Sequence, residues 1–372
     1  MRKSGEFFGG GTVPPGLAQA SPGLPGATPC FSRSGKNGPA ATGAPFAETL
    51  RWARDLLAPT WRTAVKRLPP TIRDLVDYHC GDPAGASGGK GVRPALVFLA
   101  AEAVGGTASA AVDAAVAVEL VHNFSLLHDD VMDNDRVRRH RPTAWVVYGT
   151  PAAVLAGDAL HALAIQTLAE NGGPLAQWGV PCLGEALLAL VAGQCADLEF
   201  ADRSAVSLSE CLEMAAGKTG ALLGVACALG AFAGGADPQR ADALRRFGGH
   251  LGLAFQLVDD LLGIWGDPAL TGKPVGADLV ARKRTLPVVA ALTSGHPAAG
   301  ELAGRYGRPH SGSTEATELA RLVERAGGRD WAWAESRRQL DEALACLAAA
   351  RPEPATADRL VGLAHSLADR DR

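Results

Sequence analysis

Residues 119–135 read ELVHNFSLLHDDVMDND, and this stretch decides the expected fold. Its apolar residues recur at spacings of three and four, as at Leu120, Phe124 and Leu127, which is the period of a helix with one buried face. The same spacing returns in residues 247–262, and no sustained alternation of apolar and polar residues suggests a sheet. We therefore predict a fold that is mostly or entirely α-helical.

The composition of the chain limits the classes of protein to consider. It has 372 residues, of which 47% are apolar, so it is long enough to bury a large core. Its 36 Lys and Arg residues against 39 Asp and Glu residues give a net charge of −3, and this balance argues against nucleic acid as a partner. The seven cysteines form no C-x-x-C pair, and no apolar signal segment follows Met1, so we predict a cytoplasmic location.

The sequence divides into a tail and one domain. Residues 1–45 contain 10 Gly and 7 Pro residues and too little apolar surface to offset the chain entropy of folding, so they are predicted to be disordered. Residues 46–372 are predicted to form a single all-α domain. Within it, the 18 uncharged residues 219–236 are expected to form a tightly packed core helix and not a membrane span, and residues 295–313 are expected to form a loop.

The sharpest chemical feature is a pair of aspartate clusters in two apolar helical stretches. On a helix, Asp129 and Asp133 lie about one turn apart on the same face, and Asp130 lies about 100° round the axis. Asp259 and Asp260 repeat the pattern in the second stretch, where an unpaired charge is costly to bury. Carboxylates without cysteine or paired histidine suit a hard cation such as Mg²⁺, which is usually shared with substrate phosphates. The two clusters therefore predict a shared magnesium site for a phosphorylated substrate.

Basic residues lie near both aspartate clusters and in two further segments. Arg matches a phosphate group with two parallel donors, and Lys binds it as a point charge. Together with the acidic clusters, these residues predict a pocket for a polyphosphate: Lys90, Arg93, Arg138, Arg139, Arg141, Lys218, Lys273, Arg282, Lys283 and Arg284. A P-loop is excluded because it would require glycine at the position of Leu212, and no G-x-S-x-G motif suggests a hydrolase.

A series of motifs follows in order between about residues 88 and 287. They are GGKGVRP, ELVHNFSLLHDDVMDND, RRHRPT, LAGDAL, GQCADLEF, KTGAL, FQLVDDLLGIWGD, TGKPVGADL and KRTLP. In this order they resemble the trans-isoprenyl diphosphate synthases of the polyprenyl synthetase family, most of all the short-chain geranylgeranyl diphosphate synthases. The resemblance implies the isoprenoid synthase fold, which is a single-domain all-α bundle around a deep central cavity, and it implies a homodimer.

The resemblance also assigns roles to individual residues. It implies catalytic roles for Asp129, Asp130, Asp133, Asp259, Asp260 and Lys218, with Asp129, Asp133 and Asp259 as ligands of three Mg²⁺ ions. The allylic diphosphate is expected to contact Arg138, Lys218, Thr219, Gln256, Lys273 and Lys283, with Asp278 close by. Isopentenyl diphosphate is expected to bind Lys90, Arg93, His122 and Arg139.

The implied reaction is the Mg²⁺-dependent, head-to-tail condensation of isopentenyl diphosphate with dimethylallyl, geranyl or farnesyl diphosphate, catalysed by a prenyltransferase. Product length depends on what blocks the cavity below the first acidic motif. Phe124 lies five residues before Asp129, and the smaller Ser125 follows it. An aromatic residue at only the first of these positions resembles the C20 enzymes, so geranylgeranyl diphosphate is the expected product and farnesyl diphosphate the alternative. Phe124 could instead be a core residue that faces away from the cavity.

Two departures from the family pattern leave alternatives open. Gly91 stands where the family usually has a basic residue after Lys90. Gly263 stands where the second acidic motif of the family commonly has a third aspartate, so a weakened metal site is expected. A class I terpene cyclase and a non-catalytic partner subunit are the alternatives from other classes, but a cyclase would lack the site formed by Lys90 and Arg93. The tail of residues 1–45 is expected to be inert or, as in some bacterial relatives, to load the enzyme into an encapsulin shell.

Overall fold

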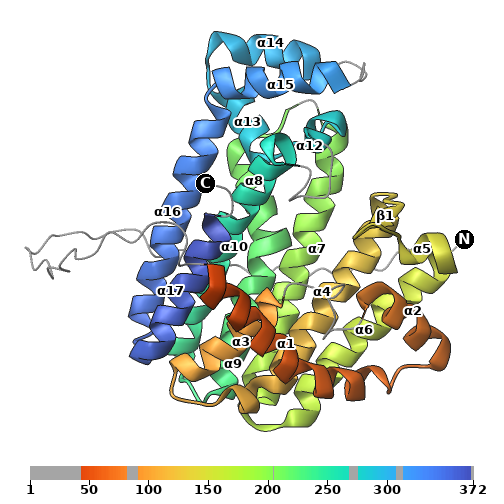
Figure 1. The fold of residues 1–372 in the computed structure, drawn as a ribbon, viewed down its shortest axis with the longest axis vertical. Helices are drawn as coiled ribbons and strands as arrows, with labels where there is room; N and C mark the ends of the chain where they lie inside the picture. Colours follow the sequence, from red (N-terminus) through yellow and green to blue (C-terminus); the bar gives the residue numbers. More distant parts are fainter. Residues whose placement is uncertain (1–42, 82–90, 204, 268–274, 307–312, 370–372) are drawn as a thin grey trace, which may run out of the picture. The chain divides into compact units, whose positions relative to one another are not determined.

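The structure is a computed structural model of the chain, and it describes residues 43–81, 91–203, 205–267, 275–306 and 313–369 (Figure 1). Most of the predicted tail, with its expected role in an encapsulin shell, therefore lies outside the described residues, as do Lys90 and Lys273. The last three positions of the predicted tail begin the first helix.

The described residues are almost entirely helical, which confirms the predicted all-α fold. The first part of the helical unit contains α1 (Gly43–Val65), α2 (Pro70–Cys80), α3 (Val92–Ala103), η1 (Ala108–Ala111), α4 (Val112–Met132), α5 (Ala144–Tyr148), α6 (Thr150–Asn171), η2 (Leu175–Gly179) and α7 (Val180–Asp202). The second part contains α8 (Leu208–Ala215), η3 (Ala216–Gly220), α9 (Ala221–Ala233), α10 (Pro238–Trp265), α12 (Ala277–Val280), α13 (Leu286–Thr293), α14 (Pro297–Tyr306), α15 (Ser313–Arg325), α16 (Gly328–Ala349) and α17 (Pro354–Ala368). Within the described ranges the strands are β1 (Val137–Arg138) and β2 (Arg141–Pro142), a short antiparallel hairpin that follows α4.

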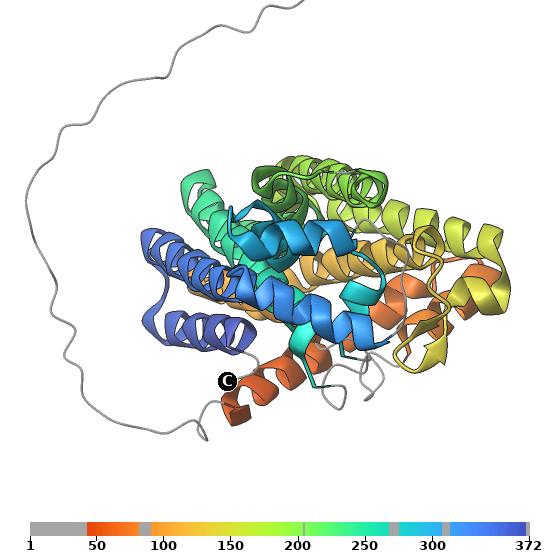
Figure 2. The ribbon, with the colours of Figure 1, turned by 90° about the horizontal axis from the view of Figure 1, so that it is seen from above.

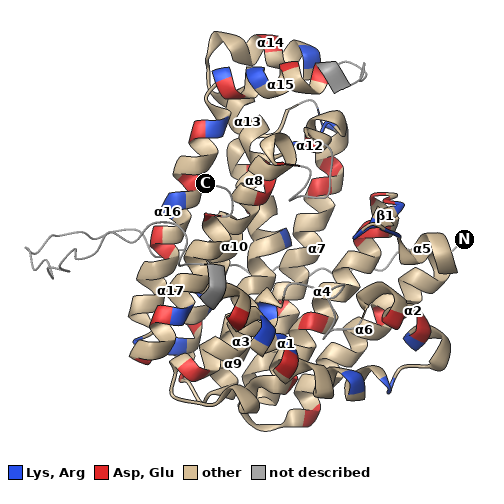
Figure 3. Ribbon diagram, viewed as in Figure 1, with Lys and Arg blue, Asp and Glu red and all other residues tan. Residues whose placement is uncertain are grey.

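The long helices pack around α10, which contacts both α9 and α16 (Figures 1 and 2). Helix α4 packs along α6 and also contacts α9. Since α10 packs on α9 as well, the two apolar stretches that carry the aspartates belong to one helical unit. Helix α7 contacts η3 and α9. Figure 3 shows acidic and basic residues together at β1, next to the end of α4, whereas much of the length of the central helices carries no charge.

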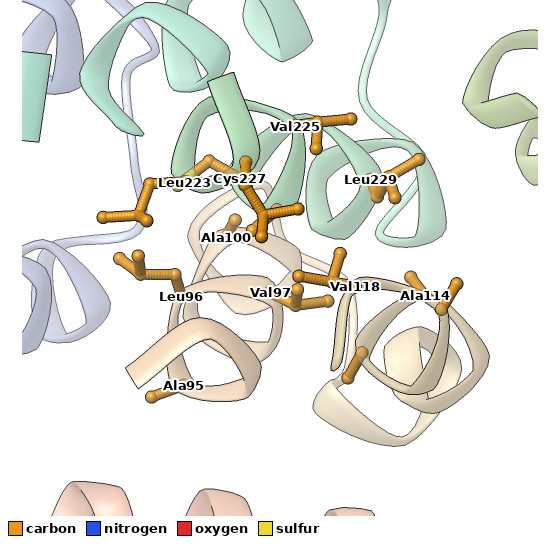
Figure 4. Close-up of a cluster of buried hydrophobic side chains, with 14 of the residues drawn as sticks. Ala95, Leu96, Val97, Ala100, Ala114, Val118, Leu223, Val225, Cys227 and Leu229 are labelled. Atoms are coloured by element: carbon orange, nitrogen blue, oxygen red, sulfur yellow. The ribbon is translucent and has the colours of Figure 1, made fainter. Parts of the chain in front are cut away.

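The core contains small residues that let helices approach closely. Figure 4 shows one part of it, where Val97 of α3, Val118 of α4 and Leu229 of α9 belong to the same buried cluster. Gly230 has no room for a side chain, because a Cβ there would lie 2.1 Å from the Val97 carbonyl oxygen. All of residues 222–232 in α9 are buried, so the predicted core helix is confirmed.

The predicted loop at residues 295–313 is wrong, because most of its first part forms α14. This helix buries Leu302 and Tyr306 in a hydrophobic cluster that includes Leu319 and Val323 of α15. Gly300 and Gly304 lie on its exposed face, where an added Cβ would meet nothing within 4 Å. Glycine lowers helix propensity, and two of the ten residues of α14 are glycine. They obscure the four-residue spacing of Leu302 and Tyr306, which pack against α15 in the folded protein.

Candidate active site

A cavity of about 550 Å³ lies between α4, α7, η3, α10 and α12 and brings the two acidic motifs together. Its walls contain most of the residues predicted for the allylic diphosphate and its metal ions: Asp129, Asp133, Arg138, Lys218, Thr219, Gln256, Asp259, Asp260 and Lys283. Asp135, Asp197, Asp278 and Arg284 line it as well. Since residues from distant parts of the sequence share one cavity, the acidic clusters form a joint site and not two separate solvent-facing surfaces.

Asp129 and Asp133 lie at the C-terminal end of α4. The Asp133 N–H donates to the Asp129 carbonyl oxygen at 2.8 Å, where the helix ends. Burial raises the pKa of the Asp129 carboxyl to about 6, a shift that the Lys218 charge opposes and the Asp133 charge increases. A helix C-terminus also disfavours negative charge. A cation bound between these two carboxylates would relieve both penalties.

Asp130 does not line the cavity but holds a residue that does. Its side chain is 1% exposed, and its Oδ1 accepts a hydrogen bond from Nε of Arg138 at 2.7 Å. Arg138 lies on β1 and forms part of the cavity wall. The second carboxylate oxygen of Asp130 is buried and has no partner among the described residues. Asp130 therefore reaches the cavity through Arg138, and its predicted catalytic role stays a prediction.

Asp260 is the centre of a hydrogen-bond chain that joins η3, α10 and α13. The Thr219 hydroxyl donates to Oε1 of Gln256 at 2.6 Å, and Nε2 of Gln256 donates to Oδ1 of Asp260 at 2.7 Å. The other oxygen of Asp260 accepts the Leu286 N–H at 2.9 Å. Burial raises the pKa of the Asp260 carboxyl to about 7, although these hydrogen bonds lower it. These hydrogen bonds fix the first residue of α13 and the side-chain amide of Gln256 beside the cavity.

Lys218 reaches the cavity from the π-helical turn η3 and pairs with Asp197 of α7 at 2.5 Å. A Cβ on Gly193 would lie 2.5 Å from the Lys218 backbone nitrogen, so glycine there allows α7 and η3 to approach. Sequence reasoning missed Asp197. Its one signal is its place in the GQCADLEF motif, since a single carboxylate on an apolar helix has no pattern of its own.

Three of the residues predicted to bind isopentenyl diphosphate lie near one another. Burial lowers the pKa of His122 well below its usual range, and the charges of Arg93 and Arg139 lower it further. The Nε atom of Arg93 is buried and has no partner among the described residues. Glu119 interacts with both arginines and offsets part of their charge, and the unpaired buried donor of Arg93 suits an anion. The fourth predicted residue, Lys90, is outside the described part of the chain.

Phe124 lies in the core before the first acidic motif and is not part of the cavity wall. Its ring stacks on His161 of α6 with centroids 5.3 Å apart, and it meets the His128 ring edge to face at 4.9 Å. The Ser125 hydroxyl donates to the His122 carbonyl oxygen at 2.8 Å. Any role of Phe124 in product length is therefore shared with His161, a residue that no sequence pattern singled out.

The oxygen-only donor set of the cavity fits a hard cation. Among the described residues, no three His, Cys, Asp or Glu side chains are close enough to enclose a metal ion on their own. Asp129, Asp133 and Asp259 nevertheless line one cavity, together with the cations Lys218 and Arg138. Such a site fits Mg²⁺ that keeps several waters and completes its coordination with oxygens of a bound diphosphate.

A larger cavity of about 910 Å³ lies between α7, η3, α9 and α10. Many of its lining residues are alanine or glycine, and none is a predicted site residue. Charged residues of both signs line the larger cavity too, but both acidic motifs and most of the residues predicted to bind the allylic diphosphate line the smaller one, which is therefore the candidate active site.

The fold and this cavity define an enzyme of the all-α isoprenoid synthase type, in which acidic segments of two helices face basic residues. The chain belongs to the polyprenyl synthetase family, whose sequence profile matches residues 72–323. The resemblance drawn from the motifs is thereby confirmed, and so is the prediction of a prenyltransferase.

Two relatives from Mycobacterium tuberculosis strain H37Rv are similar over most of their length. The (2E,6E)-farnesyl diphosphate synthase is 45% identical over 328 residues, which cover 86% of this chain and 91% of the relative. The geranylgeranyl diphosphate synthase is 44% identical over 330 residues, which cover 87% of this chain and 93% of the relative.

Solved structures agree with this fold. A polyprenyl synthetase from Streptomyces coelicolor A3(2) has a TM-score of 0.83 at 46% identity and covers 87% of this chain and 99% of its own. A polyprenyl synthase from Caulobacter crescentus CB15, solved with calcium and isoprenyl diphosphate, has a TM-score of 0.77 at 29% identity and covers 90% of this chain and 100% of its own.

Proposed function

We propose that this protein is a short-chain trans-prenyl diphosphate synthase that condenses isopentenyl diphosphate with an allylic diphosphate to make geranylgeranyl diphosphate. One observation carries the proposal: Asp129 of α4 and Asp259 of α10 line the same cavity as Lys218 and Arg138. Farnesyl diphosphate is the second candidate product, because the relatives named for the C15 and C20 products are almost equally similar to this chain.

Magnesium is the proposed cofactor, with three ions held by Asp129, Asp133 and Asp259 and by oxygens of the allylic diphosphate. The oxygen ligands of the cavity support a hard divalent cation, as does the calcium bound to the Caulobacter crescentus relative. When bound, Mg²⁺ neutralises the diphosphate and makes it a better leaving group.

The residues of the chain position the two substrates and place charge around the leaving group. Lys218 and Arg138, held by Asp197 and Asp130, present fixed positive charge to the diphosphate. The bond between C1 and oxygen of the allylic substrate breaks, and the double bond of isopentenyl diphosphate attacks the resulting cation. Loss of a proton then restores a double bond, and the departing diphosphate accepts that proton. Water must be excluded, because it would quench the cation.

The direct test is an assay of the purified chain alone with Mg²⁺, isopentenyl diphosphate and each allylic primer. We expect a linear prenyl diphosphate, identified by mass spectrometry, and no turnover after chelation of the metal. A cyclic hydrocarbon from an allylic diphosphate alone would identify a terpene cyclase. No product from any primer would favour a non-catalytic partner subunit.

The proposed product length depends on the stack of Phe124 and His161. Phe124 lies about one turn and a half before Asp129 and stacks on His161 with centroids 5.3 Å apart, and a product tail that extends from the cavity into this part of the core would meet the stack. Phe124→Ala should therefore lengthen the products, whereas Phe124→Tyr keeps the ring and should not. Chain lengths measured by mass spectrometry that are the same in the alanine variant and the wild type would remove this role from Phe124.

We further propose that the enzyme is a homodimer formed through α6 and α7. Large apolar residues are exposed on these two helices: Val154, Leu155, Ile165, Leu188, Val191 and Leu198. By length and composition alone, four helical stretches within the described ranges could cross a membrane, and the one that contains α7 is only 28% buried. A second copy is the better partner, because α7 also supplies Asp197 to the cavity and a two-fold pair would cover the same face on both chains.

Light scattering after gel filtration tests the dimer. The wild type should have twice the mass of one chain, and Leu188→Glu, at a position that is 74% exposed, should shift it towards the monomer. A monomeric wild type, or binding to lipid vesicles in place of self-association, would contradict the proposal.

A cytoplasmic location and a separable tail complete the proposed function. Deletion of residues 1–42 should leave turnover unchanged, since the described helices begin after it. If the tail loads the enzyme into a protein shell, the deletion should abolish co-purification with that shell, whereas an inert tail leaves both properties unaffected.

A further inference from the structure

Gly263 lies one helical turn after Asp259 on α10, on the same face of the helix. A Cβ added to Gly263 would lie 1.9 Å from Oδ2 and 2.7 Å from Cγ of Asp278. These distances are far below any contact that carbon and oxygen atoms can make. The carboxylate of Asp278 therefore already occupies the space that a side chain at position 263 would need.

The position of Asp278 is set by its own short helix. Helix α12 follows Gly276, whose φ of 73° is in the left-handed region that favours glycine. The Lys283 N–H donates to the Asp278 carbonyl oxygen at 2.9 Å, so the turn that carries Asp278 also carries the predicted substrate residue Lys283. Asp278 is half-buried and lines the same cavity as Asp259.

Three carboxylates thus gather at this end of α10. Asp259, Asp260 and Asp278 all line the cavity, and Lys283 and Arg284 line it as well. Like charges repel, so three carboxylates here require positive charge, of which the side chains of the cavity supply a part and a bound divalent cation would supply more. Two of the three, Asp259 and Asp260, are in the acidic motif of α10, and the third comes from a different element.

We propose that Asp278 supplies the third carboxylate of the second acidic site, in the place of a side chain at position 263, and that Gly263 is required to leave room for it. The inference rests on the proposed function, because the ligand is a divalent cation together with a diphosphate. Gly263 and Asp278 then act together: the motif DDLLG lacks a third aspartate, and Asp278 supplies a carboxylate to the metal site instead.

Four variants distinguish the effect of steric room at position 263 from the effect of the Asp278 carboxylate. Gly263→Ala and Asp278→Ala should each weaken the Mg²⁺-dependent binding of inorganic diphosphate by about 10- to 100-fold, the range found for residues that support metal ligands. The double variant Gly263→Ala/Asp278→Ala has room for its side chains but no carboxylate, and it should bind as weakly as Asp278→Ala. Gly263→Asp/Asp278→Ala returns a carboxylate from the other side and should recover most of the affinity.

Isothermal titration of the full chain with Mg²⁺ and inorganic diphosphate measures these affinities without turnover. Gly249→Ala on the same helix is the matched control, because a Cβ there would meet nothing within 4 Å and the residue is not part of the candidate active site. If Gly263→Ala fails to fold, the two double variants still separate the possibilities. Wild-type affinity in both Gly263→Ala and Asp278→Ala overturns the inference, whereas a wild type that neither binds diphosphate with Mg²⁺ nor turns over overturns the proposed function itself.

Discussion

Neighbouring aspartates in each acidic motif have different surroundings, because successive residues on a helix point about 100° apart. Asp129 and Asp259 line the cavity, and Asp259 is exposed. Asp260 also contributes to the cavity wall, but Asp130 and Asp260 are only 1% and 7% exposed, and each accepts a hydrogen bond from a second element. The repeated DD pair therefore combines one residue directed at the ligand with one that fixes the protein around it.

Removing Asp260 should destabilise the protein more than removing Asp259. Asp260→Ala leaves the Leu286 N–H and the Gln256 amide without their acceptor in a buried place. A buried donor without a partner costs about 1–3 kcal/mol, and loss of the buried carboxyl, whose pKa is raised to about 7, offsets part of that cost at neutral pH, so we expect the free energy of unfolding to fall most clearly near pH 5. Urea denaturation of the metal-free protein measures it, with Asp259→Ala as the exposed control. Equal losses in the two variants would contradict the structural role of Asp260.

His79 should make the protein sensitive to acid. Burial, with the charges of Arg138 and Arg139, lowers the pKa of His79 from 6.5 to about 3 in the folded state. The unfolded chain binds a proton below about pH 6.5, so the stability due to neutral His79 is present above that pH and is lost as the pH falls towards 3. Between about pH 7 and about pH 4.5, His79→Gln should lose about 2 kcal/mol less stability than the wild type. Urea denaturation at both pH values tests this, and parallel losses would rule it out.

At the scale of whole elements, the crossing of α9 and α10 depends on glycine. A Cβ on Gly248 would lie 2.3 Å from the Leu223 carbonyl oxygen and 2.8 Å from Sγ of Cys227, whereas one on the next residue, Gly249, would meet nothing within 4 Å. Neighbouring residues of one helix thus have opposite steric environments. Since α10 carries the second acidic motif, its separation from α9 also sets the place of that motif.

Alanine at these two positions should have effects of opposite sign. Gly248→Ala forces α9 and α10 apart and should lower the free energy of unfolding by about 1–3 kcal/mol, the usual cost of overpacking. Gly249→Ala should raise it by up to about 1 kcal/mol, because alanine favours the helix. Thermal and urea denaturation of the two variants would measure both changes. Two variants of the same stability would show that α9 and α10 can separate at no cost.

Helix α14 shows what element prediction lacked. The Tyr306 hydroxyl at its end donates to the Lys283 carbonyl oxygen at 2.6 Å, so a segment expected to be a loop supports a predicted substrate residue. Gly300 and Gly304 lower the local helix propensity, whereas Pro297 stands at the first helical position, where proline is favoured, and packing against α15 stabilises the helix. The apolar stretches of α4 and α10 were predictable because their periodicity is long and uninterrupted.

At the scale of the molecule, the fold class and the shared cavity of the two acidic motifs could be predicted from the sequence, because a series of motifs in a fixed order indicates both. It does not reveal partners that come from tertiary structure. Asp197 pairs with Lys218, His161 stacks on Phe124, and Asp278 fills the space at Gly263, and each of these pairs joins residues distant in sequence. Periodicity describes a single helix, so contacts between helices lie outside what it can predict.

The distribution of charge over the whole cavity predicts that Mg²⁺ and diphosphate bind together. No three described acidic, cysteine or histidine side chains enclose a metal, so Mg²⁺ alone has too few ligands. Asp197 and Asp130 hold Lys218 and Arg138 in place but also offset part of their charge, so these two residues alone do not neutralise a diphosphate. Bound Mg²⁺ neutralises the acidic residues, which favours binding of the diphosphate anion, and the diphosphate oxygens complete the coordination of Mg²⁺.

Thermal denaturation with Mg²⁺ alone, inorganic diphosphate alone and both should therefore show a stabilisation that is far larger than the sum of the separate effects. A ligand at about 100 times its Kd stabilises the folded state by about 2.7 kcal/mol, which is enough to raise the Tm by several degrees. Chelation of the metal should reverse the rise, and Asp129→Ala, which removes a carboxylate of α4 from the cavity, should abolish most of it. Full stabilisation by Mg²⁺ alone would mean that the carboxylates of α4, α10 and α12 already form a closed metal site, and the helices would then have to bring them closer than this structure does.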